Sequence, residues 1–535
     1  MKMTRTFAAL ALLVAAASCC NNTEDGGQSL LIGDDIAIAQ TQYGKIQGYI
    51  YNDVYHFLGV PYGASTAGEN RFMPPVAPEP WDGVLRTICY GDSAPQAQAN
   101  FNTQNWGAFR DHWNYGLITE DCLRLNVWTP ALDGGKRPVI VWLHGGGYSA
   151  GNGVEQDGYT GGNFARTQDA VFCSVNHRLN CFGYCDLASV GGEKYKHSGN
   201  VGMLDIIAAL QWVHDNIAEF GGDPDNVTII GQSGGGSKVC TIAAMPAAKG
   251  LVHKAVALSG NSVSASDKQN AEALGEAVLK EAGLKPSEID KLQQMPWEEF
   301  YALANKASRS LAAKGIRAGF SPVGDDIDIP SHFYEAGRED IPDVPMIICS
   351  TSNEFVSSVT SPELEQNTRE DIIKMIEPRY GEKSAAIYDE YAALFPDDTP
   401  YGIYSVISSS RDGVFRTATT KLQQSSPVYV AWFRWYPNLM SGRMRAFHSL
   451  DICFWFNNTD LMYTHTGGSR EARALSSKMA ASLAQFMRTG NPDGAKGGLP
   501  AWGTFTPEGG ETMVLDNVPS FGPAPDAAAR ALMND

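Results

Sequence analysis

The stretch Asn226–Cys240 reads NVTIIGQSGGGSKVC and decides the fold. Its first five residues predict a short buried strand, and the alanine-rich run after Cys240 is typical of a helix. Between them Gly231–Gly235 reads GQSGG, a G-x-S-x-G sequence at a strand-to-helix turn. These five letters alone would also fit an ordinary glycine-rich loop. In this context the glycines allow a tight turn that exposes a hydroxyl, so Ser233 is the predicted nucleophile.

A second glycine cluster lies upstream, at the end of another predicted strand. The apolar run Pro138–Leu143 predicts a buried parallel strand, and it leads into His144–Tyr148, which reads HGGGY. Glycines at such a place let backbone N–H groups approach a substrate closely. We expect the N–H groups of Gly146, Gly147 and Gly234 to form an oxyanion hole. Loss of one such donor typically costs about 10²–10³ in turnover.

A nucleophilic serine needs a base, and on this kind of fold the order along the chain is serine, acid, histidine. Three histidines lie well beyond Ser233. His448 stands in a loop-like stretch that enters an aromatic run. His332 is expected at the surface, at the start of a helix-like segment, and His465 is expected to be solvated. His448 is therefore the predicted base.

The acid should follow a core strand. Pro345–Cys349 predicts a buried strand, and Glu354 comes a few residues after its end. A carboxylate at the C-terminal end of such a strand is well placed to hold a histidine. Spacing alone leaves Asp325, Asp326 and Asp451 as competitors for this role.

Further motifs accompany the serine turn. The chain reads FLGVPYG at Phe57–Gly63, EDCLRLNV at Glu120–Val127 and NHRL at Asn176–Leu179. Together with Gly199–Val213, these motifs resemble the signatures of the type-B carboxylesterase/lipase family. That family includes the cholinesterases and bacterial para-nitrobenzyl esterases. The similarity extends from residue 43 to about residue 516.

The resemblance implies an α/β-hydrolase fold and a serine carboxylic ester hydrolase that acts through an acyl-enzyme on small-molecule or aryl esters. It implies that Ser233 is the nucleophile, Glu354 the acid and His448 the base, and it ranks Glu354 above its competitors. Asp451 matches an acidic position that is structural in the family. No metal or organic cofactor is required. Two alternatives are a non-catalytic cholinesterase-like binding module and an acyltransferase that uses the same triad.

Three departures from the family pattern stand out. Gln232 replaces the glutamate usual before the serine in the animal enzymes, so a negative charge is missing there, which weakens the case for a cationic choline ester. Gly234 replaces the usual alanine, which predicts a looser turn. Ala94 stands where the family has the cysteine that pairs with Cys122, and Cys89 is a possible substitute.

Apolar runs alternate with helical patterns along the chain, which predicts an α/β fold with a mostly parallel central sheet and helices on both faces. We expect residues 36–535 to form a single catalytic domain, with a helical cap-like insertion at about 362–424. The predicted strands are Pro138–Leu143, Ala170–Val175, Val227–Ile230, Ala255–Leu258, Met346–Cys349 and Val428–Phe433.

The N-terminus predicts export. Basic residues precede an apolar run from Phe7 to Ala17, which is typical of a signal peptide over residues 1–18. Small residues then end on cysteine, as in a bacterial lipoprotein, so Cys19 is the predicted lipidated residue and Cys20 the alternative. Residues 19–35 would form a polar tether to the outer membrane or cell surface. A cut near Ala17 would instead give a periplasmic or secreted enzyme.

The net charge of −18 at pH 7 argues against nucleic acid as a partner, and contact with a membrane is expected only through the lipid anchor. The expected partner is a small-molecule ester. Trp106 and Trp113 lie in the loop before the EDCLRLNV signature, and Tyr148 ends the HGGGY stretch. These aromatic residues predict a pocket for an aryl ester, although each could equally pack on the rim.

Overall fold

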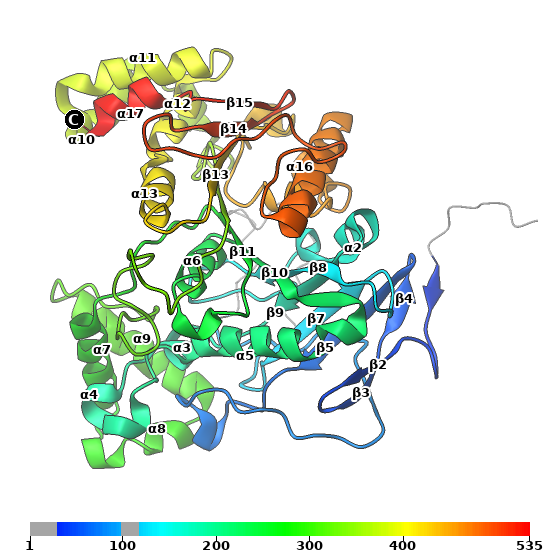
Figure 1. Cartoon of the computed structure of the whole chain (residues 1–535). Helices are drawn as coiled ribbons and strands as arrows, with labels where there is room; N and C mark the ends of the chain where they lie inside the picture. The colour runs from blue at the N-terminus through cyan, green and yellow to red at the C-terminus, as the bar shows by residue number, and fades with distance from the viewer. Residues whose placement is uncertain (1–28, 98–116, 535) are drawn as a thin grey trace, which may run out of the picture.

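The structure, a computed structural model, describes residues 29–97 and 117–534 (Figure 1). Within these residues the centre is a twelve-stranded sheet with the order β1-β4-β5-β7-β9-β8-β10-β11-β12-β13-β14-β15. The seven strands from β9 to β14 in that order run parallel, and antiparallel strands flank them on both sides. The predicted mostly parallel sheet is confirmed.

The parallel strands are β9 (Val171–Val175), β8 (Arg137–Leu143), β10 (Gly222–Gln232), β11 (Lys254–Leu258), β12 (Met346–Thr351), β13 (Val428–Phe433) and β14 (Thr512–Leu515). The flanking strands are β1 (Leu30–Leu31), β4 (Tyr49–Tyr51), β5 (Val54–Pro61), β7 (Arg124–Thr129) and β15 (Ser520–Gly522). A separate small sheet contains β2 (Ile38–Thr41), β3 (Gly44–Gln47) and β6 (Val84–Arg86).

Strand β8 shows why these runs form central strands. Its residues from Pro138 to Leu143 are all buried, because both faces of the sheet are covered. Val139 and Val141 pack into the core cluster that contains α5 (Val201–Asn216) and α6 (Gly234–Ile242). Trp142 packs into the cluster on the other face. All six predicted strands are found at these positions.

Helices cover both faces of the sheet (Figure 1). Helix α16 (Arg470–Thr489) contributes to the core cluster opposite α5 and α6. It begins after Ser469, whose hydroxyl accepts the N–H of Ala472 at 3.0 Å, and ends at Gly490, with φ +76°. The other helices outside the 362–424 region are α2 (Gly162–Gln168), α3 (Asn180–Gly183), α4 (Ala188–Gly191), α7 (Lys268–Glu281), α8 (Lys291–Gln294), α9 (Trp297–Ala312), α14 (Ile452–Trp455), α15 (Tyr463–Thr466) and α17 (Ala527–Asn534).

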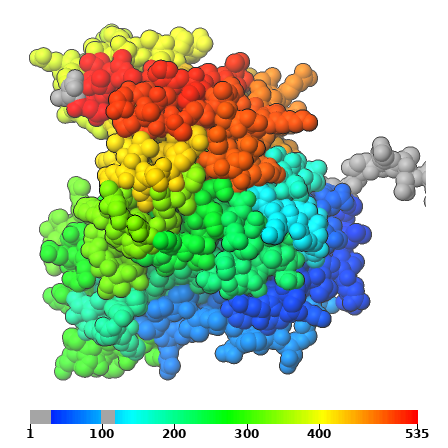
Figure 2. Space-filling model, viewed as in Figure 1, coloured from blue at the N-terminus to red at the C-terminus, as the bar shows by residue number. Residues whose placement is uncertain are grey.

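The region 362–424 is helix-rich, as predicted. It contains α10 (Arg369–Tyr380), α11 (Ser384–Leu394), α12 (Pro400–Ser408) and α13 (Asp412–Lys421). Residues of α10, α11 and α12 share an apolar cluster with α17, and Figure 2 shows yellow and red surfaces together at one end of the molecule. That this region caps the pocket stays a prediction.

The structure also bears on the cysteines, on His332 and on the length of the helices. The eight cysteines in the described residues are free; Cys122 is buried and Cys89 is exposed. His332 is exposed, as expected. The helix-like segment expected to begin there is absent, and His332 instead forms an isolated antiparallel bridge with Ser264. None of the helices that the structure describes has the length and apolar character needed to cross a membrane.

Candidate active site

Ser233 lies at the junction of β10 and α6, where its backbone is strained. Its φ of 59° and ψ of −124° are unusual for a residue with a side chain. The turn is held by the bond from Ser233 N–H to the Leu258 carbonyl, 2.8 Å. A Cβ at Gly231 would lie 2.4 Å from the Gly235 carbonyl oxygen, and one at Gly235 would lie 2.0 Å from the Leu143 oxygen. Both glycines of the motif are therefore required by close packing.

Gly234 lies in close contact with the HGGGY loop. A Cβ on this residue would lie 2.1 Å from the carbonyl oxygen of Gly147. An alanine, which the family usually has here, would push these two backbones apart. The missing methyl group thus lets the HGGGY loop pack directly on the start of α6, while the looser turn expected from Gly234 stays a prediction.

The HGGGY loop presents free N–H groups next to Ser233. Gly146 and Gly147 are exposed and have φ values of +81° and +63°, which favour glycine. Within the described part of the chain no acceptor takes their N–H groups. Gly234 contributes a third N–H from the first turn of α6, at the positive end of the helix dipole. The structure thus places the three predicted donors on two segments in direct contact.

His448 is paired with a carboxylate. Its Nδ1 forms a hydrogen bond with Oε2 of Glu354, three residues beyond the end of β12. The other carboxylate oxygen of Glu354 accepts the N–H of Thr351 at 3.0 Å. Burial lowers the pKa of His448, but the charge and hydrogen bond of Glu354 outweigh it, so the pKa of His448 is raised above its usual 6.5.

Gln232 brings this pair next to the serine. Its Nε2 lies 3.4 Å from Nδ1 and 3.2 Å from Nε2 of His448, so the amide is in contact with the imidazole. Its Oε1 accepts the hydroxyl of Ser449 at 3.1 Å. No hydrogen bond joins Ser233 Oγ to His448 within the described structure. Such catalytic bonds are often long until a substrate is bound.

The competing acids have other partners. One oxygen of Asp325 accepts three backbone N–H groups, at 2.9–3.0 Å, and Asp326 bonds to Ser331, so both serve a local turn. Asp451 is fully buried and accepts the indole N–H of Trp455 at 3.3 Å. Burial and the nearby charge of Glu354 raise the pKa of Asp451 to about 7.

His465 is not solvated, contrary to expectation. It is buried on α15, and its ring packs 5.8 Å from that of Phe447. Its Nδ1 lies 3.1 Å from the hydroxyl of Thr464. The polar sequence around it suggested exposure, but the neighbouring loop covers it.

The loop that carries His448 is strained. Met440, Ser441, Arg445 and Ser449 all have φ values between 50° and 77°. Each such residue costs of order 1–3 kcal/mol and persists only where the surrounding structure enforces it. The loop therefore needs an external anchor.

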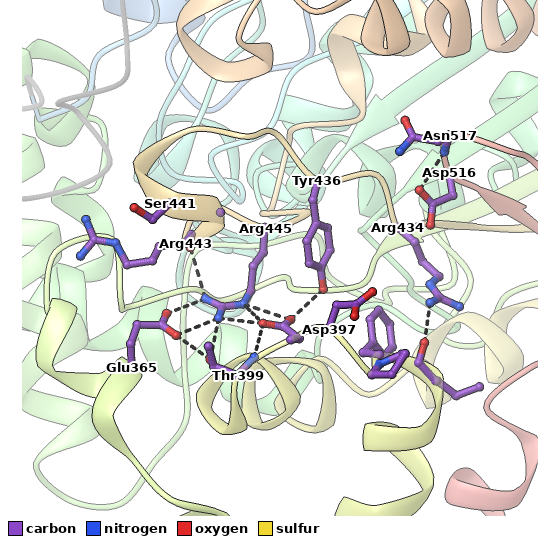
Figure 3. Close-up of a pocket in the computed structure, with 15 residues that line it drawn as sticks. Glu365, Asp397, Thr399, Arg434, Tyr436, Ser441, Arg443, Arg445, Asp516 and Asn517 are labelled. Carbon is purple, nitrogen blue, oxygen red and sulfur yellow. Dashed lines mark hydrogen bonds and ion pairs between the residues drawn. The ribbon is translucent and has the colours of Figure 1, made fainter.

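Arg445 supplies this anchor beside a cavity of about 360 Å³ (Figure 3). Its guanidinium bonds to Glu365 at 2.7 and 2.9 Å and to Asp398 at 2.9–3.2 Å. Burial raises the pKa of Glu365, but the hydrogen bond of Arg445 prevails and holds it at about 2. These partners come from the segment after Glu354 and from the turn before α12, so one side chain ties three segments together.

The predicted aromatic pocket is only partly described. Trp106 and Trp113 lie outside the described residues. Tyr148 is half-buried, and its ring meets that of Tyr184 edge-on at 5.4 Å. Phe355 was missed from the sequence: it is 69% exposed and its ring is nearly parallel to that of His448, at 13° and 6.2 Å. Its position directly after Glu354 was the available signal.

Three features lie together at one edge of the parallel sheet. They are a serine at a strained strand-to-helix turn, glycine N–H groups beside it, and a histidine paired with a glutamate. Together they define a serine hydrolase with the α/β-hydrolase fold. Residues 35–529 match the Carboxylesterase family, and the chain belongs to it. It is thus a carboxylesterase.

Among its relatives is the para-nitrobenzyl esterase of Bacillus subtilis, 32% identical over 487 residues that cover 90% of this chain and 95% of that one. Phenmedipham hydrolase of Pseudarthrobacter oxydans is 30% identical, covering 89% and 94%. A solved esterase from Clostridium hathewayi that can hydrolyse aliphatic aromatic polyesters superposes with a TM-score of 0.81 at 30% identity, covering 95% and 99%.

The pH dependence of activity tests the pair of Glu354 and His448. A base must be neutral, so activity should fall as the pH falls through the raised pKa of His448, above 6.5. We expect Glu354→Gln to move this acid limb to lower pH and to lower kcat about 10⁴-fold. Initial rates from pH 5 to 9 measure both effects. Glu363→Gln, an exposed neighbour, is the control, and an unmoved limb in Glu354→Gln would contradict the pairing.

Removal of the Arg445 anchor should affect stability and rate together. Arg445→Met leaves Glu365 and Asp398 buried without their cation, which we expect to cost about 3–5 kcal/mol in the free energy of unfolding. The freed loop should also lower kcat. Arg369→Met, which breaks an exposed pair with Asp389, should cost at most about 1 kcal/mol. Denaturant unfolding and kcat measure the difference, and equal losses in the two variants would refute the anchor.

Proposed function

We propose that Ser233 is the nucleophile of this carboxylesterase, His448 its base and Glu354 the acid that orients the base. The N–H groups of Gly146, Gly147 and Gly234 then form the oxyanion hole. The observation that carries the proposal is the position of Gln232: it directly precedes Ser233 and touches both nitrogens of the imidazole that Glu354 holds.

The mechanism is acyl transfer to water. His448 takes the hydroxyl proton of Ser233 as its oxygen attacks the ester carbonyl, and the glycine N–H groups stabilise the resulting oxyanion. His448 then gives the proton to the leaving alcohol as the ester bond breaks. Water, deprotonated by His448, attacks the acyl-enzyme, and the serine hydroxyl is restored with release of the acid.

We propose aryl and other small, neutral esters as substrates. The relatives named for para-nitrobenzyl esters and for phenmedipham support this substrate class. So does Phe355, whose exposed ring beside His448 offers an apolar surface to an aryl or acyl group. The neutral amide of Gln232 gives no attraction to a cationic alcohol such as choline.

Hydrolysis of para-nitrophenyl esters of graded acyl length tests this function. We expect Ser233→Ala to fold normally and to lose activity on the order of 10⁶-fold, because no other group can form the acyl-enzyme. Ser237→Ala, one turn further along α6, is the matched control and should remain active. Full activity in Ser233→Ala would overturn the assignment. Product analysis with added alcohols separates hydrolysis from acyl transfer.

We further propose that the protein is exported and anchored by a lipid on Cys19. The support is the sequence alone: basic residues, an apolar run, then Ser18 and Cys19 before a polar tether. These residues lie outside the described part of the chain. Location at the outer membrane or cell surface follows from such an anchor.

Metabolic labelling with an alkyne fatty acid in a bacterial host tests the anchor. We expect label on the wild type and on Cys20→Ser, but none on Cys19→Ser, which should leave the membrane fraction. Label that depends on Cys20 would move the site. An unlabelled wild type would indicate a periplasmic or secreted enzyme instead.

A further inference from the structure

A buried lysine lies on the helix that follows the proposed nucleophile. Lys238 is on α6, five residues after Ser233, and its side chain is 0% exposed. Lysine is almost never fully buried unless it is paired, since a charge loses its hydration in the interior. Within the described residues Lys238 forms no ion pair. Its position therefore needs another explanation.

The ammonium group of Lys238 binds the oxyanion loop. Nζ donates to the carbonyl oxygen of His144 at 3.0 Å and lies 5.8 Å from the ring centre of Tyr148. Burial lowers the pKa of Lys238 to about 7, although the charge of Glu155 raises it. Burial and the charge of Lys238 hold the pKa of both His144 and His177 well below the usual value, so these stacked rings are neutral.

The loop is tied to α6 near its end, where the hydroxyl of Tyr148 bonds to Thr241 and Ser237 of that helix, but the glycines before Tyr148 have no such tie of their own. Gly146 and Gly147 have no side chains to pack, and glycine leaves the backbone free. The bonds from the N–H groups of Ser149 and Ala150 to the Gly146 carbonyl, both 3.2 Å, lie within the loop itself. The bond from Lys238 joins α6 to the loop at His144, the residue directly before the glycines.

We propose that Lys238 is a positioning residue that fixes the oxyanion loop on the nucleophile helix. It thereby makes the N–H groups of Gly146 and Gly147 converge with that of Gly234 before the substrate arrives. This inference rests on the proposed oxyanion hole and adds a residue to its support. The absence of a Cβ at Gly234 permits the close contact with Gly147, and Lys238 holds it.

Where the pH is below about 7 and Lys238 holds its proton, its positive charge acts in the same direction as this hydrogen bond. Because Lys238 is buried, its charge is screened less than that of a surface lysine, so it stabilises a nearby developing negative charge more strongly. A neutral ester carbonyl gains little from it. Loss of Lys238 should therefore weaken binding of the transition state and leave binding of the substrate nearly unchanged.

Lys238→Met tests this role, with Lys421→Met as a matched control. Lys421 is also 0% exposed, on α13, with its Nζ 5.6 Å from the ring centre of Tyr334 and 3.6 Å from Asp343. We expect Lys238→Met to lower kcat about 10–100-fold with KM changed less than twofold, since one oxyanion donor is typically worth about 10²–10³. Lys421→Met should keep kcat within twofold at a comparable loss of thermal stability.

A pair of inhibitors gives a readout that a merely structural role would not move. A trifluoromethyl ketone analogue of the best ester forms an anionic adduct with the serine, whereas the matching methyl ketone binds as a ground-state analogue. In Lys238→Met we expect the affinity for the trifluoromethyl ketone to fall by the same factor as kcat. The affinity for the methyl ketone should not change.

Equal weakening of both inhibitors, or an unchanged kcat, would overturn the role of Lys238. If the methionine variant does not fold, Lys238→Gln, which lacks the charge and reach of lysine, takes its place with the same expected and overturning results. An inactive wild type, or an active Ser233→Ala variant, would instead refute the proposed function. The two failures are therefore distinguishable.

Discussion

The backbone contact between the end of β8 and the start of α6 is the constraint on which the site depends. A Cβ at Gly234 or Gly235 would lie 2.0–2.1 Å from the carbonyl oxygens of Gly147 and Leu143. Gly236 packs less tightly but still closely, with its Cβ position 2.8 Å from the Leu258 oxygen. Because β8, β10 and β11 are parallel neighbours, their C-terminal ends meet at one edge of the sheet, and glycine lets the segments that follow them touch.

The proposed acid and base lie at the same edge of the sheet, but a longer segment of chain connects the base to its strand. Glu354 follows β12 directly, whereas His448 lies on a strained loop after β13. The hydrogen bonds of Arg445 hold this loop in place, and its two carboxylate partners come from the helical 362–424 region. That region is thus coupled to the position of the imidazole, whether or not it covers the pocket.

Much of this arrangement could be predicted from the sequence. The apolar runs predicted the central strands because strands such as β8 are buried on both faces. The serine turn was recognisable because strand, glycines and helix are contiguous. Spacing could not choose Glu354 over Asp325, since that choice depends on how distant loops fold. From the sequence alone Lys238 would be expected at the surface. The three-dimensional structure shows that it is buried and bonded to the HGGGY loop.

Gln232 and Lys238 act on the developing negative charge in the same electrostatic direction. A Cβ at Gly145 would lie 3.3 Å from Oε1 of Gln232, so residue 232 adjoins the oxyanion loop. A glutamate there would place a negative charge beside the developing oxyanion and oppose it. The neutral Gln232 removes that opposition, and Lys238, when protonated, adds attraction from beneath the loop, where it bonds to the His144 carbonyl. The charges that surround the proposed oxyanion hole therefore favour neutral esters, whose transition states gain negative charge, over cationic ones that would need a carboxylate.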